Sequence, residues 1–305
     1  MKHIYDKIKE YKTIIIHGHK RPDGDCYGAQ FGLKNIIENT YPEKDVYVVG
    51  QKSDFVDYVG QMDVISDDVY KGALSIVVDT ATSERISEER YTLGKEIIKI
   101  DHHIPIDQYG DYQWVDTSFP SCAQMIAYFA KTFDMKITKP GAVAMYTGIL
   151  TDTGRFKYRG VSQLTHELAG MLLSNGADVE EIDQQLSKES LNVIRYKGFI
   201  YQNFITDNGF IYVKVSKDQV KEFGLTYEEA SSVVNILGGI DGYPVWAILL
   251  EQEDNTIRVR LRSNGPDIDK VANQFKGGGH AKASGATLDN WEELPAFIKA
   301  VKEVI

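Results

Sequence analysis

The sequence predicts an α/β fold: an N-terminal parallel-sheet domain and a smaller mixed α/β C-terminal domain, with a cleft between them. Three observations lead to this prediction. The chain has 305 residues, more than one hydrophobic core usually organises. Short β-branched runs alternate with helical patterns in the first half, as in parallel sheets that helices cover on both faces. The last third of the chain contains a hairpin signal between two strand patterns.

Four short apolar runs predict the strands of the N-terminal sheet: Thr13–Ile16, Asp45–Val49, Ala73–Val78 and Ile97–Ile100. Segments with helical patterns predict the helices of the same domain: Tyr27–Asn39, Cys122–Thr132, Gly141–Leu150, Gln163–Ser174 and Val179–Leu186. We therefore assign residues 1–187 to a first domain. The stretch that follows is charged and polar, so residues 188–200 are assigned to a helical or irregular linker.

Residues 201–305 form the predicted second domain. Its patterned segments are Phe210–Val215, Tyr227–Leu237, Val245–Glu251, Thr256–Arg262, Ile268–Phe275 and a final helix near Trp291–Val304. A turn at Glu253–Asn255 separates two strand patterns, which predicts a β-hairpin. The chain has no internal repeat and no low-complexity segment.

Composition narrows the classes of partner. The 34 basic and 44 acidic side chains give a net charge of -10, which argues against long duplex nucleic acid but allows a small phosphorylated ligand. No apolar stretch is long enough for a signal peptide or a membrane span, so no membrane contact is expected. The two cysteines, Cys26 and Cys122, lack C-x-x-C spacing and fit a reducing compartment. We expect a cytoplasmic protein with two packed thiols.

The first chemical cluster follows the opening strand, where HGHKRPDGD contains His17, His19, Asp23 and Asp25 within nine residues. Imidazole and carboxylate groups are ligands that suit Mn²⁺, and alternate residues of an extended loop can serve two different ions. A solvated turn is the alternative, because Pro, Gly and Asp are common turn residues. His17 adjoins the apolar strand, and a buried core histidine is as good an interpretation as a ligand.

Three further acidic or histidine motifs follow apolar segments: Asp79, then Asp101, His102 and His103, and finally Asp152. Taken singly, Asp79 could cap a helix and Asp152 could be a loop residue. The carboxyl ends of strands share one edge in an open α/β sheet, so we expect the set to meet there. Two divalent ions about 3.5–4 Å apart require a bridging carboxylate and several terminal ligands, which this set supplies. The sequence has neither a phosphate-binding loop with its Lys-Ser/Thr pair nor a dinucleotide fingerprint.

In the second domain, Gly277, Gly278, Gly279 and His280 form a GGGH segment. Three glycines let backbone N–H groups approach an anion closely, and the histidine adds a donor, although a simple turn is an equal alternative. A guanidinium can grip a phosphate through two hydrogen bonds, so Arg262 is the first candidate for this role. Arg258 and Arg260 share its face of the strand and are ranked well behind, as solvated side chains.

These residues resemble the motifs of the DHH phosphoesterases. The order is H-x-H-x-x-P-D-x-D, a strand-terminal Asp, then D-H-H, then an Asp before T-G-R-F. The segments RVRLRSN and GGGHAKASGA resemble the signature of the DHH-associated domain, so the likeness covers nearly the whole chain. One departure is Thr151, where many members have glycine before the fourth aspartate.

The resemblance implies a role for each motif residue. His19, Asp23 and Asp79 would hold one Mn²⁺ ion, and Asp25, Asp79, His102 and Asp152 would hold a second, with Mg²⁺ or Co²⁺ as substitutes. His103 would face the phosphate, and Asp101 would orient the histidines. The substrate would be held by Arg155, Arg262, Gly277, Gly278, Gly279 and His280.

The length and domain content resemble the nano-RNase group. The resemblance implies hydrolysis of short oligoribonucleotides, and of pAp, by water attack at two metal ions. A phosphodiesterase for c-di-AMP or its linear product pApA is the nearest alternative, and a homodimer is compatible with the sequence. A manganese pyrophosphatase shares the N-terminal motifs, but the GGGH segment argues against it. A non-catalytic nucleotide sensor would normally have lost ligands, and here every expected ligand is present.

Overall fold

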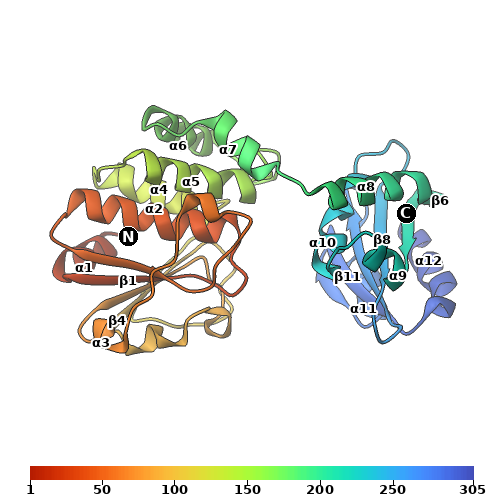
Figure 1. Ribbon diagram of the computed structural model, residues 1–305, viewed down its shortest axis with the longest axis horizontal. Coiled ribbons are helices and arrows are strands. Elements are labelled where there is room, and N and C mark those ends of the chain that lie inside the picture. Colours follow the sequence, from red (N-terminus) through yellow and green to blue (C-terminus); the bar gives the residue numbers. More distant parts are fainter. The chain divides into compact units, whose positions relative to one another are not determined.

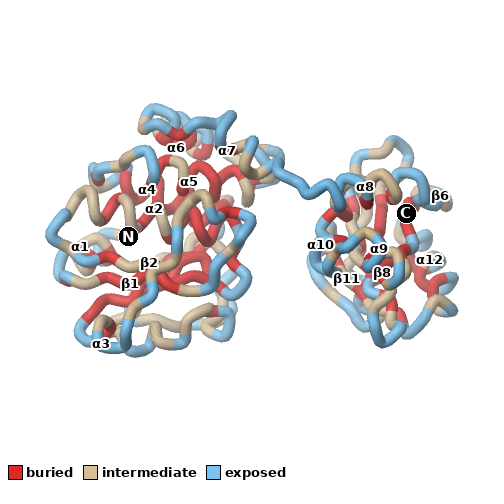
Figure 2. The backbone as a smooth tube through the Cα atoms, viewed as in Figure 1, coloured by how far each residue is buried: buried red, intermediate tan, exposed pale blue.

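The computed structural model describes residues 1–305, and its contacts divide the chain into two compact units, Met1–Lys188 and Glu189–Ile305. Each unit has its own β-sheet and its own buried cores (Figures 1 and 2). The segment that joins them, residues 187–191, is exposed along its whole length (Figure 2). No helix combines the length and the apolar character that a membrane span requires.

The first unit contains five strands that are all parallel, in the order β2-β1-β3-β4-β5. They are β1 (Thr13–His17), β2 (Asp45–Val49), β3 (Leu74–Val78), β4 (Glu96–Asp101) and β5 (Tyr112–Val115). The parallel sheet confirms the predicted fold class. The edge strand β5 was not predicted, because its four residues are only partly buried and it lacks the apolar run of the inner strands.

Helices cover both faces of this sheet. They are α1 (Lys2–Glu10), α2 (Gly24–Thr40), α3 (Asp67–Tyr70), α4 (Cys122–Thr132), α5 (Lys139–Asp152), α6 (Gln163–Ser174) and α7 (Val179–Leu186). Helices α2, α4 and α5 lie on one face, and the short α3 lies on the other (Figure 1). Glycine lets α2 and α5 approach closely: a Cβ atom on Gly28 would lie 2.5 Å from the Ala144 carbonyl oxygen and 2.9 Å from Gly148 Cα.

The connectivity of the sheet defines where a ligand belongs. From β1 the chain crosses to β2 on one side, and β3 and β4 lie on the other side of β1. In doubly wound sheets, ligands bind outside the carboxyl ends of the strands at this kind of switch point. His19 follows β1 and Asp79 follows β3, so both residues lie at the switch.

The second unit contains a mixed six-stranded sheet in the order β10-β11-β9-β8-β7-β6, in which only β7 and β8 are parallel neighbours. The strands are β6 (Ile205–Asp207), β7 (Phe210–Val215), β8 (Val245–Glu251), β9 (Ile257–Ser263), β10 (Gly278–His280) and β11 (Ala283–Leu288). The predicted hairpin is present, with β8 and β9 paired from Glu251 and Ile257 at the turn. Strands β10 and β11 were missed, because glycine, alanine and serine give a weak strand signal.

Two apolar layers cover the faces of the second sheet. One contains α8 (Leu191–Asn203), α9 (Lys217–Glu222), α10 (Tyr227–Ser232) and the 3₁₀ turn Val233–Leu237, and the other contains α11 (Asp269–Gln274) and α12 (Leu294–Lys302). Most of the stretch assigned to a linker, residues 188–200, is α8. Its Tyr196 and Ile200 are fully buried in the core of the second unit, so this helix is part of the domain. The connection itself is therefore shorter than predicted.

Candidate metal centre

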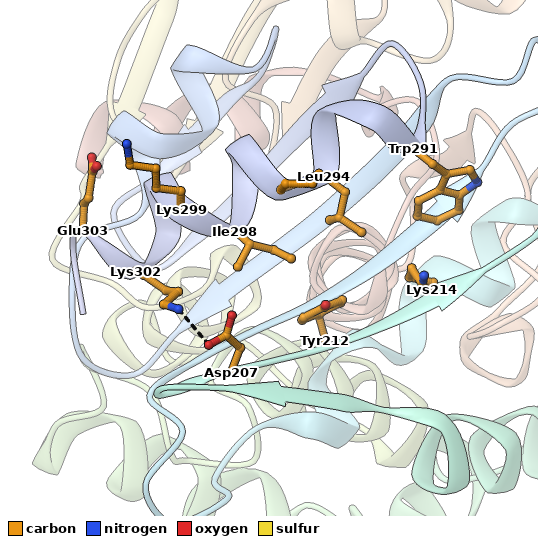
Figure 3. Close-up of a pocket in the computed structure, with 10 residues that line it drawn as sticks. Asp207, Tyr212, Lys214, Trp291, Leu294, Ile298, Lys299, Lys302 and Glu303 are labelled. Atoms are coloured by element: carbon orange, nitrogen blue, oxygen red, sulfur yellow. Dashed lines mark hydrogen bonds and ion pairs between the residues drawn. The ribbon is translucent and has the colours of Figure 1, made fainter.

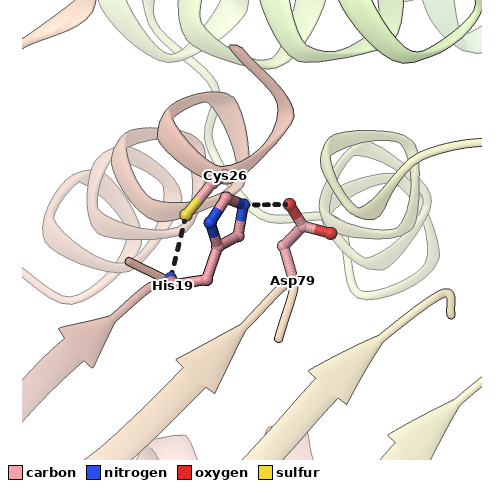
Figure 4. Close-up of side chains that lie close together, drawn as sticks. All are labelled: His19, Cys26 and Asp79. Carbon is pink, nitrogen blue, oxygen red and sulfur yellow. Dashed lines mark hydrogen bonds and ion pairs between the residues drawn. The ribbon is translucent and has the colours of Figure 1, made fainter. Parts of the chain in front are cut away.

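The carboxylate of Asp79 lies between two histidines at the end of β3. Its Oδ2 atom is 3.4 Å from His19 Nε2, and its Oδ1 atom is 3.3 Å from His102 Nε2. Figure 4 shows the His19 side of this arrangement. Asp79 is only 2% exposed, and its φ of 52° lies in the left-handed region, which aspartate tolerates better than most residues. One carboxylate thus presents a different oxygen to each histidine, an arrangement that suits a carboxylate bridging two cations.

A first group of donors surrounds His19. The Nε2 atom of this residue is 3.8 Å from Asp23 Oδ1, and its Nδ1 atom is 3.0 Å from the Lys20 carbonyl oxygen. Asp23 is the N-cap of α2, where its side chain accepts hydrogen bonds from the N–H groups of Asp25 and Cys26. Asp23 therefore caps α2 and, with the same carboxylate, lies beside His19.

A second group surrounds His102, whose Nε2 atom is 3.7 Å from Asp25 Oδ2 and 3.3 Å from Asp152 Oδ2. Its Nδ1 atom is 3.3 Å from the carbonyl oxygen of Phe119. Asp25 is fully buried, and its carboxylate accepts hydrogen bonds from two N–H groups in the first turn of α4, those of Cys122 at 2.6 Å and Ala123 at 2.9 Å. Asp152 is the last residue of α5.

Crowding of acidic groups changes their proton affinities. Burial, together with the charges of Asp79 and Asp152, raises the pKa of Asp25 well above its ordinary value. Burial and the charge of Asp79 likewise raise the pKa of Asp152 to about 7. Burial opposes protonation of His102, but Asp79 and Asp25 outweigh it and raise its pKa to about 10. The cluster therefore holds protons near neutral pH unless another positive charge replaces them.

His19 and Asp23 form an ion pair within the cluster. Burial disfavours the charge on His19, yet the nearby carboxylates of Asp23 and Asp79 raise its pKa strongly. Burial also opposes ionisation of Asp23, but the contact with His19 lowers its pKa. Cys26 lies beside this pair, and its Sγ atom accepts a hydrogen bond from the His19 N–H group at 3.4 Å (Figure 4). Complete burial raises the pKa of this thiol to about 11, as expected for a packed cysteine.

The donors fit two divalent cations. Asp79 Oδ1 and His102 Nε2 are buried and have no hydrogen-bond partner, although each could bind a cation. In both histidines the Nδ1 atom faces a backbone carbonyl and the Nε2 atom faces carboxylates, which is the usual arrangement around a metal-binding imidazole. The carboxylate and imidazole set suits Mn²⁺ or Mg²⁺ better than thiolate-bound metals. His19, Asp23 and Asp79 would hold one ion, and Asp25, Asp79, His102 and Asp152 the other.

The raised pKa values predict how the metal-free protein responds to pH. A group with a raised pKa in the folded state stabilises that state at low pH, and this contribution is lost as the pH rises through the folded-state value. We expect the Tm of the chelator-treated protein to fall as the pH rises through about 7, the value for Asp152. Thermal unfolding across neutral pH, with and without Mn²⁺, measures this, and the added ion should remove most of the decrease.

Asp152→Asn is the matched control for this experiment, because it removes one of the raised carboxyls and should flatten the pH dependence of Tm in chelator. A Tm that is constant or increases across neutral pH in the chelated wild type would contradict the crowded arrangement of these carboxylates.

His103 differs from its neighbour His102. Its Nδ1 atom is 2.8 Å from Asp101 Oδ1, and 41% of its side chain is exposed. The same Nδ1 atom is 3.6 Å from Asp79 Oδ1, so His103 borders the cluster. Asp101 therefore contacts the Nδ1 atom, which faces the protein. The rest of the His103 ring is partly exposed to solvent.

His17 lies outside the donor cluster. It is completely buried, neither ring nitrogen has a hydrogen-bond partner, and its ring lies 5.9 Å from Tyr70 and 6.3 Å from Tyr91. Burial lowers the pKa of His17 to about 3, so the ring is neutral. The structure favours the interpretation as a core histidine over the interpretation as a metal ligand.

The GGGH segment forms a strand and not the anion-binding loop expected from its composition. Gly278–His280 is β10, at one edge of the sheet and antiparallel to β11. A Cβ atom on Gly277 would lie 2.0 Å from the Gly285 carbonyl oxygen, so close strand pairing explains this glycine. An edge strand still leaves backbone groups unpaired on its outer side.

Strand register places His280 and Arg262 on one face of the sheet. His280 pairs with Ala283, and Ala283 pairs with Arg262, and residues directly opposite in antiparallel strands point to the same side. One guanidinium nitrogen of Arg262 donates to the Leu261 carbonyl at 2.9 Å and to the Ser284 carbonyl at 3.4 Å. The two predicted substrate residues therefore share a surface of the second unit.

Arg155 is held by its own unit. Its guanidinium contacts Asp183 Oδ1 at 2.7 Å and donates to Ser187 Oγ at 2.9 Å, both at the C-terminal end of α7. The structure thus gives this side chain local partners, and none of the metal-ligand candidates is among them.

A separate pocket of about 680 Å³ lies between α12 and strands β6 and β7 of the second unit (Figure 3). Trp291, Tyr212 and Ile298 contribute its apolar lining, and Lys302 forms an ion pair with Asp207 at 2.8 Å across one end. None of the predicted site residues lines it.

The chain belongs to the DHH family of phosphoesterases. Its sequence matches the DHH family, N-terminal domain, over residues 13–149 and the DHHA1 domain over residues 207–305. The first match includes every proposed metal ligand except Asp152, and the second includes Arg262 and the GGGH segment. Relatives that align over nearly the full length show the same membership.

Two curated relatives are each 42% identical to this chain. One is the bifunctional oligoribonuclease and PAP phosphatase NrnA of Bacillus subtilis, aligned over 95% of this chain and 94% of the relative. The other is the probable bifunctional oligoribonuclease and PAP phosphatase NrnA of Streptococcus mutans, aligned over 100% and 98%. Among solved structures, an exopolyphosphatase-related protein from Bacteroides fragilis has a TM-score of 0.86 at 24% identity, over 99% of this chain and 95% of the other. At this identity the likeness concerns the fold.

Proposed function

We propose that this protein is a Mn²⁺-dependent phosphoesterase that hydrolyses short oligoribonucleotides and the 3′-phosphate ester of pAp. The observation that carries the reaction type is the position of Asp79, which offers one oxygen to the His19 group and the other to the His102 group. The names of the two relatives, which align over almost the whole chain, support the substrate class. Two free and buried cysteines support a cytoplasmic location.

In this proposal, the residues of the first unit have two roles: some hold the cations and others contact the phosphate. When bound, two divalent ions would neutralise phosphate charge and lower the pKa of the attacking water. Asp25 lies in the first turn of α2 and accepts hydrogen bonds from the first turn of α4, and Asp152 ends α5, so both donor groups are fixed on rigid elements. His103 presents its exposed ring to the phosphate, and Asp101 sets the orientation of that ring through the 2.8 Å contact with Nδ1.

In this proposal, the second unit binds a second phosphate of the substrate. Arg262 and His280 share one face of its sheet, which supports a common ligand. A charged donor paired with a phosphate oxygen forms a stronger hydrogen bond than a neutral pair. The preference for substrates of a given length would then depend on the second unit, and cleavage of the bond on the first.

The test is a panel of substrates with purified protein, Mn²⁺ and a chelator control. We expect turnover of RNA two to five nucleotides long and of pAp, slower turnover of c-di-AMP, and no turnover in chelator. Mg²⁺ and Co²⁺ are compared in the same assay. Preference for c-di-AMP or pApA would instead support the alternative phosphodiesterase, and tight nucleotide binding without hydrolysis would support a sensor.

The same panel tests the grip on the second phosphate. Arg262→Ala and His280→Ala should each raise KM for pAp and short RNA, since each removes a charge-assisted contact worth ~1.5–3 kcal/mol. The effect should be much smaller on bis-p-nitrophenyl phosphate, which has no second phosphate. Arg258→Ala is the matched control, because this neighbouring arginine on the same face is already hydrogen-bonded to Thr287 at 3.0 Å. Equal losses on both kinds of substrate would mean that Arg262 and His280 support the fold.

A further inference from the structure

Lys99 is a charged residue inside the parallel sheet. It lies in the middle of β4, between Ile98 and Ile100, and is completely buried. Those isoleucines point into the core beneath α2, α4 and α5, so Lys99 points to the opposite face of the sheet. A buried ammonium group is costly unless it is paired and hydrogen-bonded, and an apolar side chain would suit this strand better. The site therefore requires an explanation beyond stability.

The ammonium group of Lys99 is fully surrounded by partners. It donates to the Ala81 carbonyl at 2.7 Å and to the Asp107 carbonyl at 3.3 Å, and it lies 4.4 Å from the ring centre of Tyr109. Its ion-pair partner is Asp101, whose Oδ2 atom is 3.6 Å away. These contacts hold the positive charge in one place beside Asp101.

Asp101 connects this charge to the site. Its Oδ2 atom has no hydrogen-bond partner and faces Lys99, whereas its Oδ1 atom accepts from the His103 N–H group at 3.3 Å and contacts His103 Nδ1 at 2.8 Å. Lys99, Asp101 and His103 thus form a continuous line from the buried strand to an exposed imidazole. Asp101 has no exposure to solvent, so Lys99 is the cation that balances it independently of His103.

We propose that Lys99 is a positioning residue that acts through Asp101 to hold the His103 ring with Nδ1 turned inward and Nε2 presented to the substrate. This inference rests on the proposed role of His103 at the phosphate. Without the lysine charge, the Asp101 carboxylate would be buried with one oxygen unpaired, and its hold on the ring would change. Lys99 touches neither the substrate nor a proposed metal ligand, so its effect must pass through the ring of His103.

The experiment compares Lys99→Met, which keeps the chain length and removes the charge, with the wild type. We expect kcat for short RNA to fall ~10- to 100-fold, as for other residues that orient a functional side chain, while KM and Mn²⁺ stoichiometry change little. Lys44→Met is the matched control, because Lys44 also donates to two backbone carbonyls and lies over a tyrosine ring, but has no connection to the site. An unchanged kcat in Lys99→Met would overturn the proposal.

A double-mutant cycle separates positioning from a general structural role. In a His103→Ala background, Lys99→Met should cause no further loss of kcat, because the ring that it orients is gone. A full additional loss would overturn the proposal. Histidine ¹⁵N NMR of the metal-free protein gives a second readout: the Nδ1 and Nε2 shifts of His103 should change in Lys99→Met and stay unchanged in Lys44→Met.

Lys99→Met combined with Asp101→Asn covers the case in which the single variant does not fold, since both buried charges are then removed together. The proposal expects this pair to have the same kcat as Asp101→Asn alone. A lower kcat in the pair would show that Lys99 acts by another route and would overturn it. An inactive wild type would contradict the proposed function, whereas an active wild type with an unaffected Lys99→Met would contradict only this inference.

Discussion

Asp79→Ala is expected to abolish hydrolysis and to weaken both metal positions together. The carboxylate lies between His19 and His102 and offers one oxygen to each. Its removal would leave two cations facing each other with less negative charge between them, so their mutual repulsion rises. Titration with Mn²⁺ by calorimetry should show both binding steps weakened, and steady-state assays should show little turnover at any practical metal concentration.

Asp63→Ala provides the comparison for this variant. Asp63 is another aspartate of the first unit, partly exposed where Asp79 is buried, and it accepts from the Val48 N–H group and pairs with Lys34 at 2.8 Å. It should lower stability without changing metal stoichiometry. Full metal content and near-normal turnover in Asp79→Ala would rule out the bridging role.

His103→Ala should lower kcat strongly while leaving metal binding intact. A donor aimed at charge that develops in the transition state contributes ~2.7–4 kcal/mol, which corresponds to a 10²–10³-fold loss of kcat when it is removed. The exposed ring of His103, with Nδ1 held by Asp101, is suited to this role. Kinetics with short RNA and calorimetric titration with Mn²⁺, performed on the same preparation, give the two measurements.

The adjacent His102 supplies the contrast. Its Nε2 atom faces Asp79 and Asp152, so His102→Ala should lose one equivalent of Mn²⁺ as well as activity. Loss of one equivalent in His103→Ala would instead assign that residue to a metal, which its 3.6 Å distance to Asp79 Oδ1 allows.

The parts of the fold that the sequence predicts best are those with strong local signals. Helix α6 begins and ends where predicted, and Ser162 and Thr165 form a capping box that fixes its first turn. The apolar runs in the sequence predicted strands β1 to β4. Strand β10 pairs with β11, and β11 pairs with β9, but the small side chains of both strands give only a weak strand signal in the sequence.

The same holds for the site: local motifs in the sequence indicate candidate residues, but contacts between distant segments appear only in the structure. Motif order pointed to His19, Asp79 and Asp152, and the fold places Asp79 beside His19 and also beside His102, which in turn lies next to Asp152. Lys99 drew no prediction from the sequence, although it stands between two isoleucines of β4. Arg155 was chosen for its place beside a motif, and its partners on α7 could be known only from tertiary structure.

The close crossing of α2 and α5 determines how much the metal centre must adjust when it binds its ions. Asp25 opens one of these helices and Asp152 closes the other, and the glycines at the crossing leave no room for the helices to shift toward each other. A Cβ atom on Gly148 would lie 2.9 Å from Asp25 Oδ1, so the backbone of α5 packs directly against the Asp25 carboxylate of α2. The two helices therefore hold the carboxylates close together before any ion binds. Cations would then relieve the repulsion between the carboxylates without first having to assemble the site.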